Sequence, residues 1–164
     1  MARAPWINDL DSTIIGSAIA KSAIDDVGIH EEPMSSNRGK YIDEYNLLAE
    51  SPVGSYWCGN FVGYHFKKCG AKTPKFTGRC QDWVQWAQAN NLWIATPEIG
   101  SAVIYGDSAG KAEHMGIVVC VPPKFSVEGN TSLDGYSRNG DVVSLKSFSK
   151  PTRTVLGYVR AESR

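Results

Sequence analysis

Residues 56–62 have the sequence YWCGNFV, and this stretch decides the expected fold. Pro52 and Gly54 interrupt the chain just before it, and apolar residues follow it at helical spacing. The pattern predicts a loop that turns into an amphipathic helix near Trp57 or Cys58. A thiol at a helix N-terminus lies in the positive end of the helix dipole, which lowers its pKa and favours the thiolate. Cys58 is therefore a candidate nucleophile.

A candidate base and two candidate orienting groups follow downstream. His114 lies in the segment EHMGIVV, which predicts a mostly buried strand, and Glu128 and Asn130 lie at the end of the next predicted strand. A cysteine, a histidine and a polar orienting group, in this chain order, are the groups of a thiol hydrolase. The spacing does not decide which of Glu128 and Asn130 contacts the imidazole.

The order of predicted elements is typical of an α+β domain. Helical spacing of apolar residues predicts helices over residues 12–27, 40–50, 57–69 and 80–90. Short apolar runs between Gly and Pro predict strands over residues 101–105, 115–121, 125–129, 141–145 and 154–159. Helices followed by about five strands indicate N-terminal helices packed against an antiparallel sheet. Ser12 or Thr13 is the expected N-cap of the first helix.

Size and charge indicate one globular domain. The chain has 164 residues and a formal net charge of zero, and no basic patch indicates a nucleic acid or an anionic membrane as partner. We expect residues 1–11 to form an arm and residues 12–164 to form a single catalytic domain. The N-terminus lacks the basic-then-apolar order of a secretory signal, so we expect another export route if the target lies outside the cytoplasm.

The four cysteines do not have the spacing of a metal knuckle, and we expect neither a metal nor a cofactor. Cys69 lies on the same predicted helix face as Cys58, and Cys80 begins the next helix. The sequence therefore does not decide whether Cys69 and Cys80 form a disulfide, although the missing secretory signal argues against one. Cys120 ends an apolar strand and is expected to be buried and inert.

Four motifs in order resemble those of the cysteine, histidine-dependent amidohydrolase/peptidase (CHAP) family. They are WCGNFV at 57–62, EIGSAVIY at 98–105, EHMGIV at 113–118 and VEGN at 127–130. The resemblance covers nearly the whole chain. Two positions depart from the family pattern: Glu113 replaces the common Gly before the histidine, and Ser101 replaces the usual Asp. Some phage members bind calcium through an acidic loop before the nucleophile, but residues 51–57 contain no acid.

The resemblance implies a papain-like fold and hydrolysis of amide bonds in the peptide part of bacterial peptidoglycan. Carried onto this chain, it makes Cys58 the nucleophile and His114 the general base. It makes Glu128 the group that orients the imidazole and Asn130 a further polar member of the site.

Two further residues are candidates for substrate binding. The tryptophans are expected mainly to pack in the core, and Trp57, which adjoins Cys58, is the best candidate among them to line the cleft. Asn37 lies in an upstream segment that resembles the lead-in of bacterial and phage members of the family.

Several biological settings fit these motifs. The chain resembles an amidase or endopeptidase that acts on the cell wall or in the periplasm, as a phage lysin, a wall-remodelling enzyme or an antibacterial toxin. A toxin would be injected by a secretion machine and neutralised by a small immunity protein. Two alternatives are a thiol hydrolase of another amide substrate and a non-catalytic binding domain in which Cys58 is only a core residue.

Overall fold

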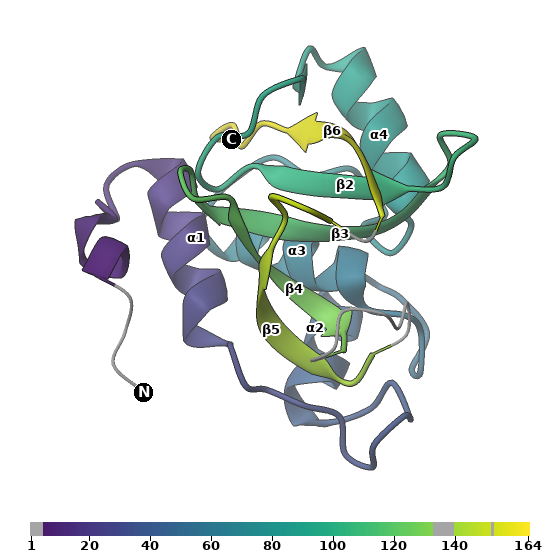
Figure 1. Ribbon diagram of the computed structural model, residues 1–164. Helices are drawn as coiled ribbons and strands as arrows, with labels where there is room; N and C mark the ends of the chain where they lie inside the picture. The colour runs from purple at the N-terminus through teal and green to yellow at the C-terminus, as the bar shows by residue number, and fades with distance from the viewer. Residues whose placement is uncertain (1–4, 133–139, 152) are drawn as a thin grey trace.

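The computed structural model describes residues 5–132, 140–151 and 153–164, which form a layer of helices packed on a six-stranded sheet (Figure 1). The helices come first: the 3-10 helix η1 (Pro5–Asp9), then α1 (Ile15–Asp25), α2 (Lys40–Leu48), α3 (Cys58–Lys68) and α4 (Cys80–Ala89). The strands are β1 (Trp93–Ile94), β2 (Ala102–Gly106), β3 (Ala112–Cys120), β4 (Phe125–Thr131), β5 (Val142–Ser147) and β6 (Thr154–Val159). The predicted α+β class is confirmed.

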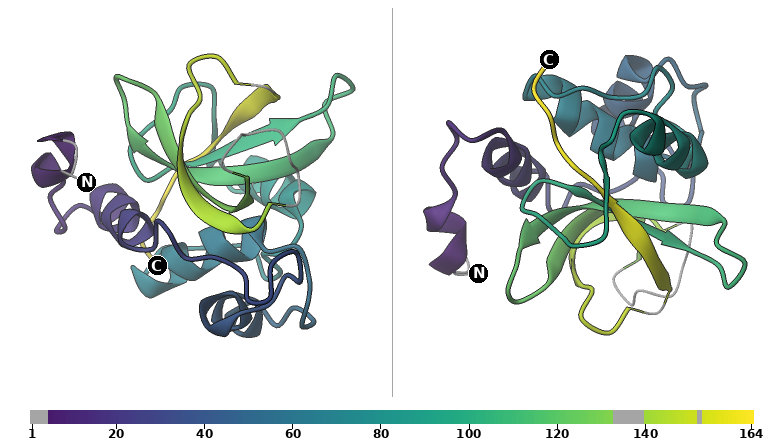
Figure 2. Two further views of the ribbon diagram at one scale, coloured as in Figure 1. Left: turned by 60° about the horizontal axis from the view of Figure 1, so that its bottom comes forward. Right: turned by 90° about the horizontal axis from the view of Figure 1, so that it is seen from above.

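The sheet is antiparallel, with the strand order β1-β6-β2-β3-β4-β5. Figure 2 shows the helices α1 to α4 on one side of it. The strand missing from the sequence-based prediction is β1, whose two residues pair with β6 and are too few to show a periodic pattern. The central strand β3 is buried along nearly its whole length, which explains its continuous apolar sequence.

A second, smaller apolar cluster lies apart from the main core. It consists of Val103, Tyr105, Val118, Phe148 and Tyr158.

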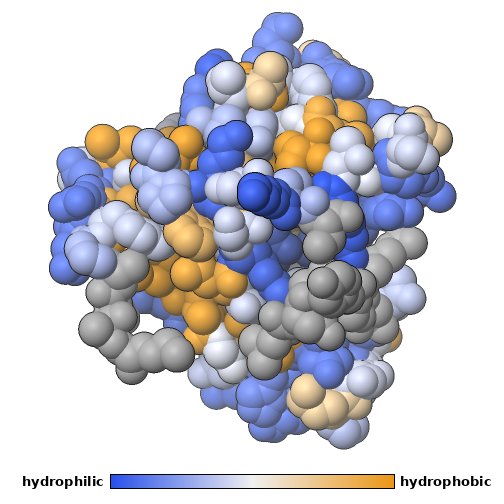
Figure 3. Space-filling view, viewed as in Figure 1, coloured by the Kyte–Doolittle hydropathy of each residue, from blue (hydrophilic) through white to orange (hydrophobic). Residues whose placement is uncertain are grey.

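Figure 3 views the molecule from the same side as Figure 1, and hydrophilic residues there surround separate hydrophobic areas. Within the described residues, every helix is too short or too polar to cross a bilayer.

The start of the chain differs from the expectation. The N-cap of α1 is Ile14 and has no side-chain cap. Asp11 Oδ1 instead accepts hydrogen bonds from the backbone N–H and the hydroxyl of Thr13, at 2.9 and 2.7 Å, which closes a turn before the helix. Within the expected arm, residues 5–9 form η1, and Trp6 stacks on Phe125 with ring centroids 6.3 Å apart. Residues 1–4 lie outside the described residues.

Helix α3 is central to the helical layer, because it packs on α1 and α2 as well as on β3 and β4. Its buried residues surround the helix axis, as expected of a core helix. Gly59 and Gly63 lie one turn apart and face Thr77. A Cβ on Gly59 would lie 2.3 Å from the Thr77 carbonyl oxygen, and one on Gly63 would lie 2.6 Å from Thr77 Cβ. These two glycines therefore allow the segment that precedes α4 to lie directly on α3.

We expect Gly63→Ala to lower the free energy of unfolding by about 1–3 kcal/mol, because the new methyl group would overlap the Thr77 side chain. The loss should appear in urea denaturation despite the higher helix propensity of alanine. Gln88→Ala, at an exposed position of α4, is the control and should change stability by less than about 0.5 kcal/mol. Equal stability of the two variants would contradict the close contact.

Candidate active site

Cys58, His114 and Glu128 come from three elements and meet at the start of α3. Cys58 is the first residue of that helix, His114 lies on β3, and Glu128 lies on β4. His114 Nε2 lies 2.9 Å from Glu128 Oε1, so Glu128 is the group that contacts the imidazole. His114 Nδ1 is buried and has no hydrogen-bond partner among the described residues. This nitrogen is the one left to interact with the thiol.

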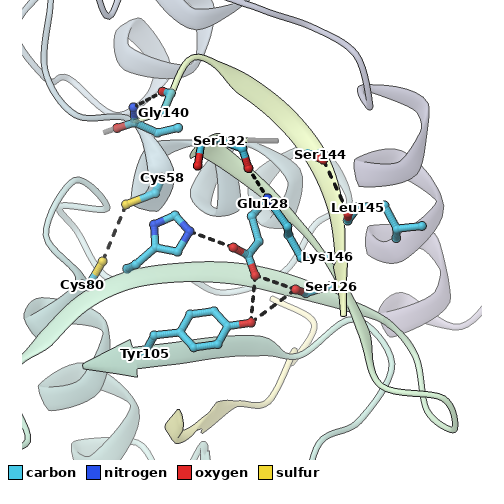
Figure 4. A network of polar contacts seen from close by, with 12 residues as sticks. Cys58, Cys80, Tyr105, Ser126, Glu128, Ser132, Gly140, Ser144, Leu145 and Lys146 are labelled. Atoms are coloured by element: carbon cyan, nitrogen blue, oxygen red, sulfur yellow. Dashed lines mark hydrogen bonds and ion pairs between the residues drawn. The ribbon is translucent and has the colours of Figure 1, made fainter. Parts of the chain in front are cut away.

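Several hydrogen-bond donors surround the Glu128 carboxylate (Figure 4). Tyr105 and Ser126 both donate hydroxyl hydrogen bonds to Glu128 Oε2, at 2.8 and 2.6 Å. Burial raises the pKa of Glu128, but the contact with His114 and the two hydroxyl groups outweigh burial and lower it below its ordinary value. The carboxylate is therefore ionised at neutral pH. Gly116 makes room for it, since a Cβ there would lie 2.5 Å from Glu128 Cγ.

The Cys58 thiol and the His114 imidazole favour the charged forms of each other. The pKa of Cys58 is held well below its ordinary value, first by the Cys80 thiol and then, against the effect of burial, by His114 and the Gly59 N–H. Burial lowers the pKa of His114, but the Cys58 thiolate and Glu128 raise it to about 9. Between these two pKa values the site holds a thiolate beside an imidazolium.

Asn130 belongs to the site but does not contact the imidazole. Its side-chain oxygen accepts a hydrogen bond from the Trp57 backbone N–H at 2.9 Å, and its amide group donates to the Gly140 carbonyl oxygen at 2.8 Å. Asn130 is fully buried and has a φ of 53°. It therefore positions Trp57, the residue that precedes Cys58.

Trp57, the tryptophan that we considered for the cleft, is fully buried, so it packs in the core and does not line a cleft. Its indole N–H donates to Glu31 Oε1 at 2.9 Å, and its ring stacks on Tyr45. Asn37 lies nearby: its backbone N–H donates to Glu31 Oε2 at 2.9 Å, and its side-chain oxygen is 3.4 Å from the Asn130 amide nitrogen. Trp57 and Asn37 thus form part of the support behind the helix start.

Four residues of this site were missed at the level of sequence: Glu31, Cys80, Tyr105 and Ser126. Ser126 could have been found, because it lies two residues before Glu128 on the same strand and so shares its face. Tyr105 pairs with His114 across β2 and β3, which only the register reveals. Glu31 and Cys80 come from distant segments, and no local pattern connects them with Cys58.

The cysteines are all thiols, so the Cys69–Cys80 disulfide is not present. Cys80 instead lies at the start of α4, with its Sγ 3.9 Å from Cys58 Sγ. Among the described residues, no group of His, Cys, Asp and Glu side chains is arranged to hold a metal ion.

The histidine of α3, His65, belongs to a separate cluster. His65 Nδ1 lies 2.8 Å from Ser22 Oγ, and His65 Nε2 lies 3.1 Å from Asp26 Oδ2. Burial lowers the pKa of His65, which keeps the ring neutral at neutral pH. These contacts connect α3 with α1.

A surface pocket of about 340 Å³ adjoins the start of α3. Its lining comes from the segments that lead into α3 and α4, and it includes Tyr56, Phe76 and Arg79. Tyr56 and Phe76 are each 54% exposed, so the pocket offers two aromatic surfaces, and Arg79 adds a cation. In the sequence, Tyr56 lies two residues before Cys58, and Phe76 lies four residues before Cys80.

Comparisons with family models, with curated proteins and with solved structures found no match to this chain.

Cys58 is expected to react with iodoacetamide at a pH well below the ordinary thiol pKa of about 8.5, because its thiolate is stabilised. Peptide mass spectrometry at several pH values gives the rate at each cysteine. His114→Ala should move the midpoint for Cys58 upward. Cys69 is the internal control, since burial raises its pKa and should keep it slow. A midpoint for Cys58 equal to that of Cys69 would contradict the ion pair.

Glu128→Gln should lower the pKa of His114 from about 9, because it removes a negative charge that favours the imidazolium. An NMR titration of the His114 ring nitrogens measures this shift directly. Asn130→Ala is the matched comparison: it should leave that pKa unchanged but lower the free energy of unfolding by about 1–3 kcal/mol, through unpaired backbone groups. If Asn130→Ala also shifted the titration, Asn130 would be acting on the imidazole.

Proposed function

We propose that this chain is a cysteine-dependent amide hydrolase with a papain-like fold, related to the CHAP family, and that it cleaves the peptide part of peptidoglycan. The observation that carries the proposal is the buried contact between His114 and Glu128 beside a thiol at the start of a helix. Glu128 holds Nε2 of the ring, so Nδ1 is left for Cys58. This arrangement suits nucleophilic catalysis by a thiolate.

The mechanism follows from the charges of these groups. The Cys58 thiolate attacks the carbonyl carbon of the substrate amide and forms a tetrahedral oxyanion. The first helical hydrogen bond at this end runs from the Phe61 N–H to the Trp57 carbonyl oxygen, so the backbone N–H groups before Phe61 are not used by the helix. We assign the Cys58 N–H to the oxyanion, since helix N-termini stabilise negative charge.

His114 supplies the proton in the next step. As an imidazolium it protonates the leaving amine, which breaks the C–N bond and leaves an acyl-thioester on Cys58. The neutral ring then takes a proton from water, and the resulting hydroxide equivalent attacks the thioester and releases the acid. Glu128 keeps the ring in place through both transfers and remains ionised.

Peptidoglycan is the favoured substrate because the four motifs resemble wall hydrolases. The pocket lined by the segments that lead into α3 and α4 would hold part of the stem peptide, with Arg79 available for a carboxylate and Tyr56 for apolar contact. An enzyme of this kind acts at the bacterial wall as a lysin or as an injected antibacterial effector. In the second setting a small immunity protein would occupy the cleft.

Digestion of purified sacculi tests this proposal. Wild type should release soluble peptide fragments, whose masses identify the cleaved bond, and Cys58→Ala should release none. Cys120→Ser is the control, because that thiol lies at the far end of β3 and its pKa is raised by burial. Release should fall above about pH 9, where His114 loses the proton that the leaving amine requires. A folded wild type that leaves sacculi of several wall chemistries intact would refute peptidoglycan as the substrate.

A further inference from the structure

Cys80 places a second thiol beside the nucleophile. Its Sγ lies 3.9 Å from Cys58 Sγ, and the two residues begin neighbouring helices, α4 and α3 (Figure 4). Both residues are buried, and each keeps 7% of its surface exposed. The catalytic mechanism proposed above does not use Cys80 as a reacting group.

The contact between the two thiols is set by the packing of the core. The Thr77 carbonyl oxygen lies so near Gly59 that no side chain fits between them. The Thr77 hydroxyl donates to Asn60 Oδ1 at 3.1 Å, and the Trp83 indole N–H donates to the Thr77 carbonyl oxygen at 3.0 Å. Thr77 thus attaches the segment before Cys80 to the first turn of α3, and Trp83, which follows Cys80, is attached to Thr77. These contacts keep the Cys80 sulfur near Cys58.

We propose that Cys58 and Cys80 form a site of oxidative modification, at which peroxide joins the two sulfurs in a disulfide and reversibly switches the nucleophile off. The disulfide itself stands on the geometry of the two thiols. Only its effect on catalysis rests on the proposed function.

The reaction balances with hydrogen peroxide as the oxidant. The Cys58 thiolate attacks one peroxide oxygen, the O–O bond breaks, and the hydroxide that leaves takes the proton of the His114 imidazolium to give water. The product is a sulfenic acid on Cys58. The Cys80 sulfur then attacks the Cys58 sulfur, the S–O bond breaks, and the departing hydroxide combines with the Cys80 proton. Two thiol groups are oxidised, and one peroxide is reduced to two waters.

Two properties single out this pair among the four cysteines: its sulfurs lie 3.9 Å apart, and the thiolate of Cys58 is stabilised. Cys58 is the thiol whose ionised form is favoured, and the thiolate is the form that peroxide oxidises. Burial raises the pKa of both Cys69 and Cys120, so these residues remain as thiols at neutral pH. A disulfide needs a sulfur separation of about 2.0 Å, so the two side chains must rotate toward each other before the bond can form.

Peptide mapping after peroxide treatment tests the proposal without any assay of activity. Each cysteine lies on a different tryptic peptide: residues 41–67, 69–72, 80–111 and 112–124. The intact wild type should lose the mass of two hydrogens, and peptides 41–67 and 80–111 should be linked until dithiothreitol separates them. A gain of two or three oxygens on Cys58 without the link, or a link between other peptides, would overturn the proposal.

Cys80→Ser removes the second sulfur and keeps a hydroxyl donor in its place. Under the same peroxide dose it should form no link and should collect two or three oxygens on Cys58, which dithiothreitol does not reverse. Cys69→Ser and Cys120→Ser are matched controls and should form the link as wild type does. If Cys80→Ser does not fold, the wild-type map alone decides.

Digestion of sacculi then separates this proposal from the proposed function. Peroxide-treated wild type should lose at least about 90% of its release, and dithiothreitol should restore it. A link that forms in a protein with no activity on sacculi would leave the redox site standing and refute only the substrate. A linked protein that still digests sacculi would overturn the switch.

Discussion

The buried carboxylate of Glu128 is the constraint on which the rest of the site depends. A negative charge that is removed from water is stable only when donors surround it, and here His114, Tyr105 and Ser126 supply them. The three donors come from three adjacent strands, so the sheet must keep one register for the charge to remain satisfied. The same constraint requires a glycine at position 116 of β3, because a larger residue there would occupy the place of the Glu128 side chain. His114 is thus oriented by the sheet and not by a flexible loop.

The start of α3 is positioned separately, by hydrogen bonds to the residue that precedes it. Asn130 holds the Trp57 backbone N–H, and Glu31 holds the Trp57 indole N–H, so the residue before Cys58 is bonded through both its backbone and its side chain. Asn130 also connects the two halves of the site, because it follows Glu128 on β4. The thiol and the imidazole therefore approach each other from two supports that share one strand. A displacement of β4 would affect both.

Local patterns were sufficient to predict the helices, most strands and the residues that meet at the site. The start of α3 was predictable because Pro52 and Gly54 end the preceding structure and an apolar helical period follows. The burial of Trp57 was not predictable, since its partner Glu31 lies on a distant loop and a tryptophan beside a nucleophile is as typical of a cleft as of a core. The neighbour of Cys58 was missed for a similar reason: Cys80 reaches it only because Gly59 and Gly63 lack side chains.

The proposed hydrolase and the proposed redox switch both depend on the thiolate of Cys58. An enzyme of peptidoglycan works outside the reducing cytoplasm, where disulfides persist, so the Cys58–Cys80 pair would meet oxidants at its place of action. The lowered pKa of Cys58, to which the Cys80 thiol contributes, favours the thiolate, and both proposals require that form. A serine at position 80 would supply a hydrogen-bond donor without a second sulfur. A cysteine there adds what a serine cannot, a sulfur that can trap an oxidised Cys58 in a recoverable form. The fraction of active enzyme would then follow from the reduction potential of the pair relative to its surroundings.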